Sequence, residues 1–202
     1  MMKHAPGATA AHDRILAATT RLLRAGVQAA TIERIIAEAG VARMTPYRHF
    51  GGKDELVSAA LEAWGAQRVQ TLSALTVRGT DDPGTGLAEL VALIDQEVAD
   101  GRPGSLVLNA AVELRGDPDH PAHAVIEAHR RAVRALLEDL AKLAGADDPA
   151  GLAAQLELVL LGALATAVVG GPEPGAVRAV AAAVLKAQGP GGGGPGGAGV
   201  AP

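Results

Sequence analysis

Side chains that could bind nucleic acid are concentrated in one short stretch, TIERIIAEAGVARMTPYRHFGGKDEL (Thr31 to Leu56). An arginine guanidinium can pair bidentately with guanine, while hydroxyl, imidazole and ammonium groups bond phosphate oxygens. A merely structural helical hairpin has no need of such groups together on an exposed surface. The polar residues in question are Arg43, Thr45, Tyr47, Arg48, His49 and Lys53.

The elements that must position these residues are two helices joined by a tight turn. The first is rich in isoleucine and is expected over residues 31–39, with Thr31 as its N-cap. The turn follows at Gly40. The second helix contains Pro46, and since proline is tolerated only in the first turn of a helix, we expect it to begin near Arg43 or Met44. Two helices joined by a short glycine-containing turn predict a helix-turn-helix, whose second helix enters the major groove of DNA.

The rest of the chain is also expected to be helical. Apolar residues recur at helical spacing, and breaks such as GTDDPGTG and GDPDHP separate the segments. No segment shows the alternation of a strand, so we predict an all-α fold with about nine helices. The expected helices cover residues 9–25, 31–39, 43–50, 53–77, 87–100, 105–115, 121–144, 149–169 and 175–188.

Composition supports this class and excludes others. Hydrophobic residues make up 49% of the 202 residues but aromatic residues only 1%, so the core must be aliphatic and rich in alanine. The chain has no cysteine, which excludes disulfides, thiolate nucleophiles and cysteine-ligated zinc. Serine, histidine and aspartate residues are too scattered to nominate a catalytic triad.

Charge is distributed unevenly along the chain. Residues 1–56 hold eight Lys/Arg and five Asp/Glu, a net charge of +3, while the remainder carries −7. A basic amino-terminal module on an acidic body is typical of a protein that binds nucleic acid at one end.

The sequence also predicts a compartment. The amino terminus lacks the apolar core of a signal peptide. The longest uncharged apolar run, Leu158 to Val169, is shorter than the roughly 20 residues that a membrane-spanning helix needs. We therefore expect a soluble cytoplasmic protein that does not enter a membrane.

The first 56 residues resemble the amino-terminal domain of the tetracycline-repressor (TetR) family. The matching pieces are RILAATTRLLRAG (Arg14 to Gly26), TIERIIAEAGV (Thr31 to Val41) and YRHFGGKDEL (Tyr47 to Leu56). The resemblance implies a three-helix DNA-binding domain over residues 1–56. It also implies a larger helical domain for ligand binding and dimerisation, here 57–188. The glycine- and proline-rich residues 189–202 are expected to form a disordered tail.

The resemblance also implies roles for particular residues. The side chains expected to face base edges are Arg43, Met44, Thr45 and Arg48, and those expected to contact phosphates are Thr31, Tyr47, His49 and Lys53. Pro46 departs from the family pattern, which has an apolar helix former there, so the recognition helix is expected to start later or tilt. Arg48 is therefore the better candidate base reader.

The function implied is that of a dimeric, ligand-responsive repressor of a palindromic operator, without enzymatic activity, cofactor or metal. The helix from Pro149 to Val169 is apolar on nearly all sides, which predicts that a second protomer covers it, with the helix from Pro121 to Ala144 as its neighbour. Trp64, Asn109 and Glu113 are candidates for lining a pocket for an unknown small molecule.

Several alternatives remain open at this stage. Asn109 and Glu113 could equally lie on a solvent-exposed edge of their helix, and Trp64 could be part of the hydrophobic core. Three histidines near two aspartates could belong to a metal-dependent helical enzyme, although a solvated loop explains them as well. A helical bundle that binds a ligand but has lost DNA binding is the third reading. The histidine group comprises His120, His123 and His129, with Asp117 and Asp119.

Overall fold

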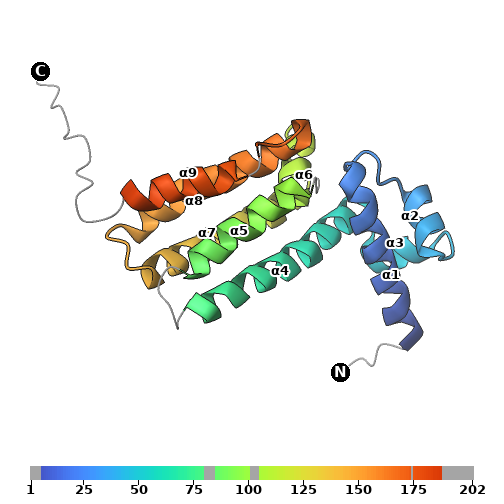
Figure 1. The fold of residues 1–202 in the computed structure, drawn as a ribbon. Coiled ribbons are helices and arrows are strands. Elements are labelled where there is room, and N and C mark those ends of the chain that lie inside the picture. Colours follow the sequence, from blue (N-terminus) through green and yellow to red (C-terminus); the bar gives the residue numbers. More distant parts are fainter. Residues whose placement is uncertain (1–5, 80–84, 101–104, 174, 188–202) are drawn as a thin grey trace, which may run out of the picture. The chain divides into compact units, whose positions relative to one another are not determined.

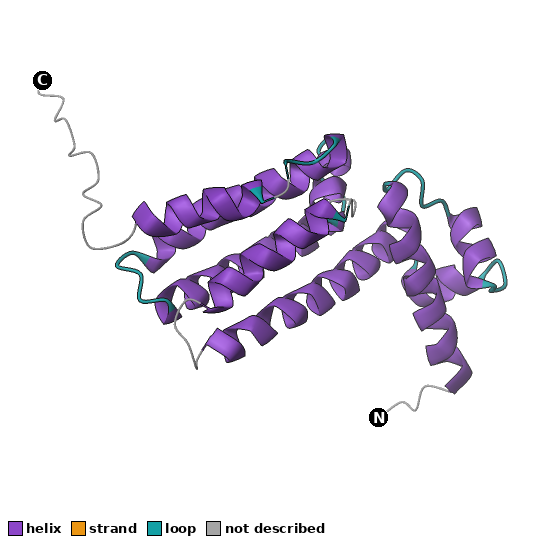
Figure 2. Ribbon diagram, viewed as in Figure 1, coloured by secondary structure: helices purple, strands orange, loops and turns teal. Residues whose placement is uncertain are grey.

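The structure is a computed structural model that describes residues 6–79, 85–100, 105–173 and 175–187 (Figure 1). Regular structure within these residues is entirely helical, which confirms the all-α prediction (Figure 2). The predicted tail, 189–202, lies outside the described residues. The α-helices are α1 (Pro6–Leu22), α2 (Ile32–Ala39), α3 (Thr45–Phe50), α4 (Lys53–Gly79), α5 (Thr85–Ala99), α6 (Leu106–Leu114), α7 (Ala122–Leu143), α8 (Pro149–Thr166) and α9 (Ala176–Ala187).

The helices form two compact units. The first comprises Met1–Ser73 with Pro103–Val133, and the second comprises Ala74–Arg102 with Arg134–Pro202. Helices α4 and α7 therefore contribute residues to both units. The domain boundary expected after residue 56 stays a prediction, but the first unit extends beyond it.

An aliphatic core holds the first unit together. Helices α1, α2, α4 and α6 all contribute side chains to it, and Phe50 and Trp64 pack against it partly buried. Helix α6 thus shares a core with the helices around the predicted recognition helix, although it lies some 50 residues further along the chain. The largest fully buried hydrophobic side chains of this core are Ile15, Ile35, Leu56, Leu61 and Val57.

The second unit is built on α5, α8 and α9, with the carboxyl-terminal half of α7. Its core is also aliphatic, and two buried carboxylates lie within it. Asp95 on α5 accepts from Arg178 Nε on α9 at 2.8 Å, and Glu157 on α8 accepts from Arg134 on α7 at 2.6 Å. Each ion pair ties two helices together, because a buried carboxylate without a partner would be strongly destabilising.

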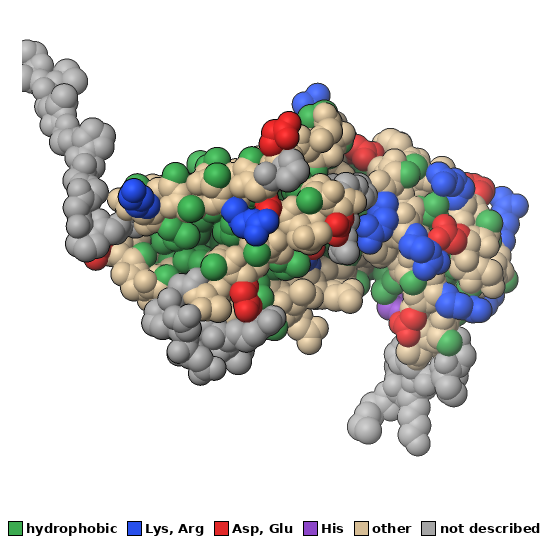
Figure 3. All heavy atoms as spheres, viewed as in Figure 1, with side chains coloured by type: hydrophobic (Ala, Val, Ile, Leu, Met, Phe, Trp, Pro, Cys, Tyr) green, Lys and Arg blue, Asp and Glu red, His purple; other side chains and the backbone are tan. Residues whose placement is uncertain are grey.

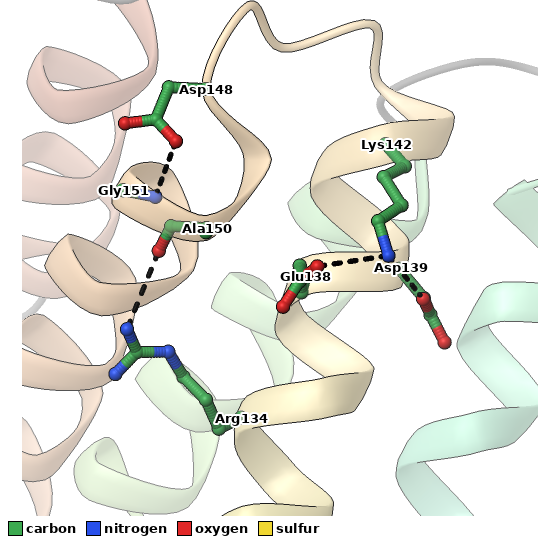
Figure 4. A network of polar contacts seen from close by, with 7 residues as sticks. All are labelled: Arg134, Glu138, Asp139, Lys142, Asp148, Ala150 and Gly151. Carbon is green, nitrogen blue, oxygen red and sulfur yellow. Dashed lines mark hydrogen bonds and ion pairs between the residues drawn. The ribbon is translucent and has the colours of Figure 1, made fainter.

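The turn between α7 and α8 is closed by polar contacts (Figure 4). Asp148 caps the start of α8, its carboxylate accepting the N–H of Gly151 at 2.9 Å. In the last turn of α7, Lys142 pairs with Glu138 and Asp139, which lie about one turn earlier in the same helix. The bond from Gly151 to Asp148 satisfies a backbone N–H that the start of α8 would otherwise leave unpaired, whereas the Lys142 ion pairs join side chains within α7.

Helix α8 has an apolar side that is exposed in the protomer. Its acidic residue, Glu157, faces inward, whereas Leu158 is 73% exposed. Together with the 3-10 turn that follows it, the helix spans Pro149–Val169, and only 33% of its most apolar stretch is buried. By length and composition alone this helix could cross a membrane, but a single helix of this kind is weak evidence, because the core helix of a soluble protein has the same length and composition. The uncharged run begins only after Glu157, whereas the helix begins at Pro149 and includes Glu157.

Candidate nucleic-acid interface

The helix-turn-helix begins at the capped start of α2. The Thr31 hydroxyl accepts the N–H of Arg34 at 3.3 Å, which confirms Thr31 as the N-cap. Gly40 ends α2 with a φ of 60°, in the left-handed region that favours glycine, and its N–H bonds Ile36 O. Both ends of α2 are therefore set by local sequence.

Helix α3 begins at Thr45, with Met44 as its N-cap. The expected start near Arg43 or Met44 was one or two residues too early, and the observed start agrees with the later start that Pro46 indicated. Pro46 is the cause, because a proline fits only the first turn of a helix. Its ring is buried, and Phe50 one turn later is half-buried against the core. Arg43 consequently lies in the turn before α3.

The structure leaves all eight candidate DNA-binding side chains accessible. Met44 is 57% and Tyr47 43% exposed, so neither side chain is part of the core. Arg43 and Arg48 are exposed, while Thr31, Thr45, His49 and Lys53 are half-buried. Lys and Arg side chains gather at the surface of the part formed by α1–α3 (Figure 3). This arrangement can bond phosphates and base edges without rearrangement of the core.

His12 on α1 is a neighbour of α3 that the sequence analysis missed. Its ring stacks on Phe50 with centroids 4.8 Å apart and meets His49 edge-on at 5.9 Å. Nothing in the sequence around His12 signals this contact, because it depends on how α1 packs against α3.

The three candidate ligand-pocket residues lie in the first unit. Trp64 is half-buried against the core and its ring lies 5.8 Å from that of His129. Asn109 is half-buried on α6. Glu113 is exposed, and its carboxylate accepts the N–H of Gln28 in the loop between α1 and α2 at 3.2 Å. Glu113 thus joins α6 to the helix-turn-helix region, and a ligand-lining role for these residues stays a prediction.

Gly26 makes the contact with Glu113 possible, and replacing it by alanine is expected to destabilise the protein by about 1–3 kcal/mol. Its φ is +110°, a conformation that only glycine adopts readily, and an added Cβ would lie 2.7 Å from Glu113 Oε1. The measurement is the free energy of unfolding in denaturant. Gly116→Ala is the matched control, since no atom lies within 4 Å of its added Cβ. Equal stability of the two variants would contradict the expectation.

His129 should make stability depend on pH. Burial lowers the pKa of His129 below 6.5, and the positive charge of Arg68 lowers it further. The unfolded chain therefore binds a proton at a higher pH than the folded protein does, so the free energy of unfolding falls as the pH drops below 6.5. His129→Phe is expected to reduce this fall, as measured by denaturant unfolding across the pH range. His123→Phe is the control, and an unchanged slope in His129→Phe would refute the claim.

The other histidines of the possible metal group have protein partners. His120 is buried, and its Nδ1 accepts the N–H of Ala122 at the start of α7. Its Nε2 lies 3.5 Å from Asp54 at the start of α4. His123 Nε2 is 2.8 Å from Asp117 O. In the part of the chain that the structure describes, no three His, Asp or Glu side chains are grouped so as to hold a metal ion.

The amino-terminal part of the chain matches a known family of bacterial regulatory proteins. A model of the bacterial regulatory proteins of the tetR family matches residues 15–60, which contain the end of α1, all of α2 and α3, and the start of α4. Among curated proteins, none is significantly similar to this sequence.

Solved structures match over nearly the whole chain. A TetR-family transcriptional regulator from Streptomyces coelicolor is 27% identical, with a TM-score of 0.71 over 89% of this chain and 96% of that one. A TetR-family regulator from Agrobacterium tumefaciens, 18% identical, gives a TM-score of 0.75 over 90% and 98% of the two chains. The regulatory protein TetR from Rhodobacter sphaeroides, 20% identical, gives 0.72 over 87% and 97%. The last two likenesses establish the fold alone.

Proposed function

Because the chain belongs to the TetR family of bacterial regulatory proteins, we propose that it is a homodimeric repressor that binds a palindromic operator and leaves it when a small molecule binds. The observation that carries this proposal is the helix-turn-helix with Arg48 and Tyr47 exposed on a helix whose inner face is anchored by Pro46. Such a protein acts by occupying DNA, not by catalysis, and it acts in the cytoplasm, where its operator is.

The roles that we propose follow from the chemistry of each side chain. Base edges are contacted by Arg43, Met44, Thr45 and Arg48, and phosphates by Thr31, Tyr47, His49 and Lys53. Since Arg43 lies before α3, we assign the main base contact to Arg48, whose guanidinium can pair bidentately with guanine. The phosphate contacts fix the register of the helix on the duplex.

We place the dimer interface on α8 and α9. The exposed apolar residues of α8 recur at helical spacing along one side, and small residues among them, Gly162 and Ala165, let a partner helix approach closely. Helix α9 packs beside α8 and exposes Val180 at 51%. This continuity favours α9, instead of the helix at 121–144, as the companion of α8. The large exposed side chains on α8 and its 3-10 extension are Leu158, Leu161, Val168 and Val169.

A two-fold dimer explains how a ligand would release DNA. The two recognition helices must lie roughly 34–36 Å apart to enter successive major grooves of one DNA face. A small molecule that binds better to a conformation with a different spacing shifts the population toward that conformation. The operator is then lost without any change in the residues that contact bases.

Selection of duplexes from a random pool tests the proposed function. The wild-type protein is expected to enrich a palindrome with half-sites about one helical turn apart. The selected duplex should bind more tightly than a scrambled duplex of the same composition, and addition of salt should weaken both. Failure to enrich any sequence would refute the proposal.

A further inference from the structure

Helix α3 depends on its neighbours for its orientation. It is only six residues long, and helices of this length are not stable by themselves in water. Pro46 is buried and anchors its first turn. The last turn carries the exposed Arg48 and the half-buried His49, and ends at Gly51 with a φ of 73°. The last turn is therefore held mainly through Phe50.

The ring of His12 on α1 stacks on the ring of Phe50. The two rings are stacked, 4.8 Å apart with an interplanar angle of 24°, and His12 also meets the ring of His49 at 68°. The His12 Nδ1 also lies 3.3 Å from the carboxylate of Asp13, which can accept a hydrogen bond from it. His12 thus contacts two consecutive residues of the turn that presents Arg48.

We propose that His12 is a positioning residue for DNA recognition, which acts through its ring on Phe50 and His49 and not through its charge. The proposal rests on the DNA-binding function proposed above. A fixed last turn holds the Arg48 guanidinium in the orientation needed for bidentate pairing with a base. Without the stack, the turn samples several orientations, and base contacts that need one geometry weaken more than phosphate contacts do.

Two variants of His12 separate its ring from its charge. His12→Ala removes both, and His12→Phe keeps an aromatic ring that can stack on Phe50. Thr9→Ala, an exposed substitution on the same helix, is the control. Each variant is measured against the palindromic duplex that the wild-type protein selects and against a scrambled duplex, at a temperature where all are fully folded by circular dichroism.

The expected result is a loss of discrimination that phenylalanine restores. His12→Ala should weaken binding to the selected duplex by roughly two- to tenfold for each half-site, the contribution of one aromatic pair. Binding to the scrambled duplex should change little. His12→Phe and Thr9→Ala should both behave as wild type. Since a residue needed only for stability would not alter discrimination in fully folded protein, the ratio of the two affinities isolates the positioning role.

Two outcomes would overturn the inference. In the first, His12→Ala retains full discrimination, so the stack does not position α3. In the second, both variants weaken the two duplexes alike and flatten the salt dependence, so His12 contacts phosphate directly. Arg48→Ala, measured alongside, tests the proposed function separately. If it leaves sequence preference intact, the assignment of α3 as the reading helix fails independently of His12.

Discussion

Leu158→Glu is expected to convert the protein from a dimer to a monomer and to weaken operator binding by about 10²-fold or more, because the second half-site is no longer held at high effective concentration. Leu158 is 73% exposed in the protomer, so the substitution should leave the protomer folded. In the dimer it would place one unpaired carboxylate from each protomer in an apolar interface, at a large desolvation cost. Sedimentation at micromolar concentration measures the mass, which is 20.2 kDa for the protomer.

A matched control distinguishes disruption of the interface from the general effect of an added negative charge. Val112 on α6 is 57% exposed and lies outside the proposed interface. Val112→Glu is therefore expected to remain dimeric and to bind the selected duplex as wild type does. A Leu158→Glu protein that stays dimeric, or a wild-type protein that is monomeric without DNA, would contradict an interface on α8.

Arg48→Ala is expected to weaken binding to the selected duplex by about 1–3 kcal/mol for each half-site and to relax the preference at one position of that half-site. The exposed guanidinium is the group on α3 best suited to read guanine. Lys53→Ala should instead weaken all duplexes alike and flatten the salt dependence by about one unit for each half-site. The measurement is the affinity for selected and scrambled duplexes at several salt concentrations.

The comparison between Arg48→Ala and Lys53→Ala distinguishes a contact with a base from a contact with a phosphate. Both remove one positive charge from the helix-turn-helix region, so their electrostatic contributions are similar. If both lower affinity without any change in sequence preference, Arg48 contacts the backbone and another residue reads the bases. The turn residue Arg43 would then be the next candidate for substitution.

Local signals in the sequence were sufficient to predict the all-helical class and both ends of α2. The caps at Thr31 and Gly40 depend on a side chain or a backbone conformation within three or four residues, so they can be predicted from sequence. The same holds for the all-α class, which follows from apolar periodicity between glycine- and proline-rich breaks. Pro46 was recognised as a constraint on α3, but the start was placed one or two residues too early because several first-turn positions tolerate proline.

Contacts between distant segments were decided only by the tertiary structure. His12 meets Phe50 across 38 residues of chain, and Glu113 meets Gln28 across 85. Such pairs have no periodic or local signature, since they depend on how whole helices pack. Helix α8 shows the same limit: its composition indicated that the protomer covers only one side of it, but not that the buried Glu157 is paired with Arg134 from α7 while Leu158 is exposed. Which side of a uniformly apolar helix turns inward depends on where its neighbours place their charged groups, and that is a property of the folded chain.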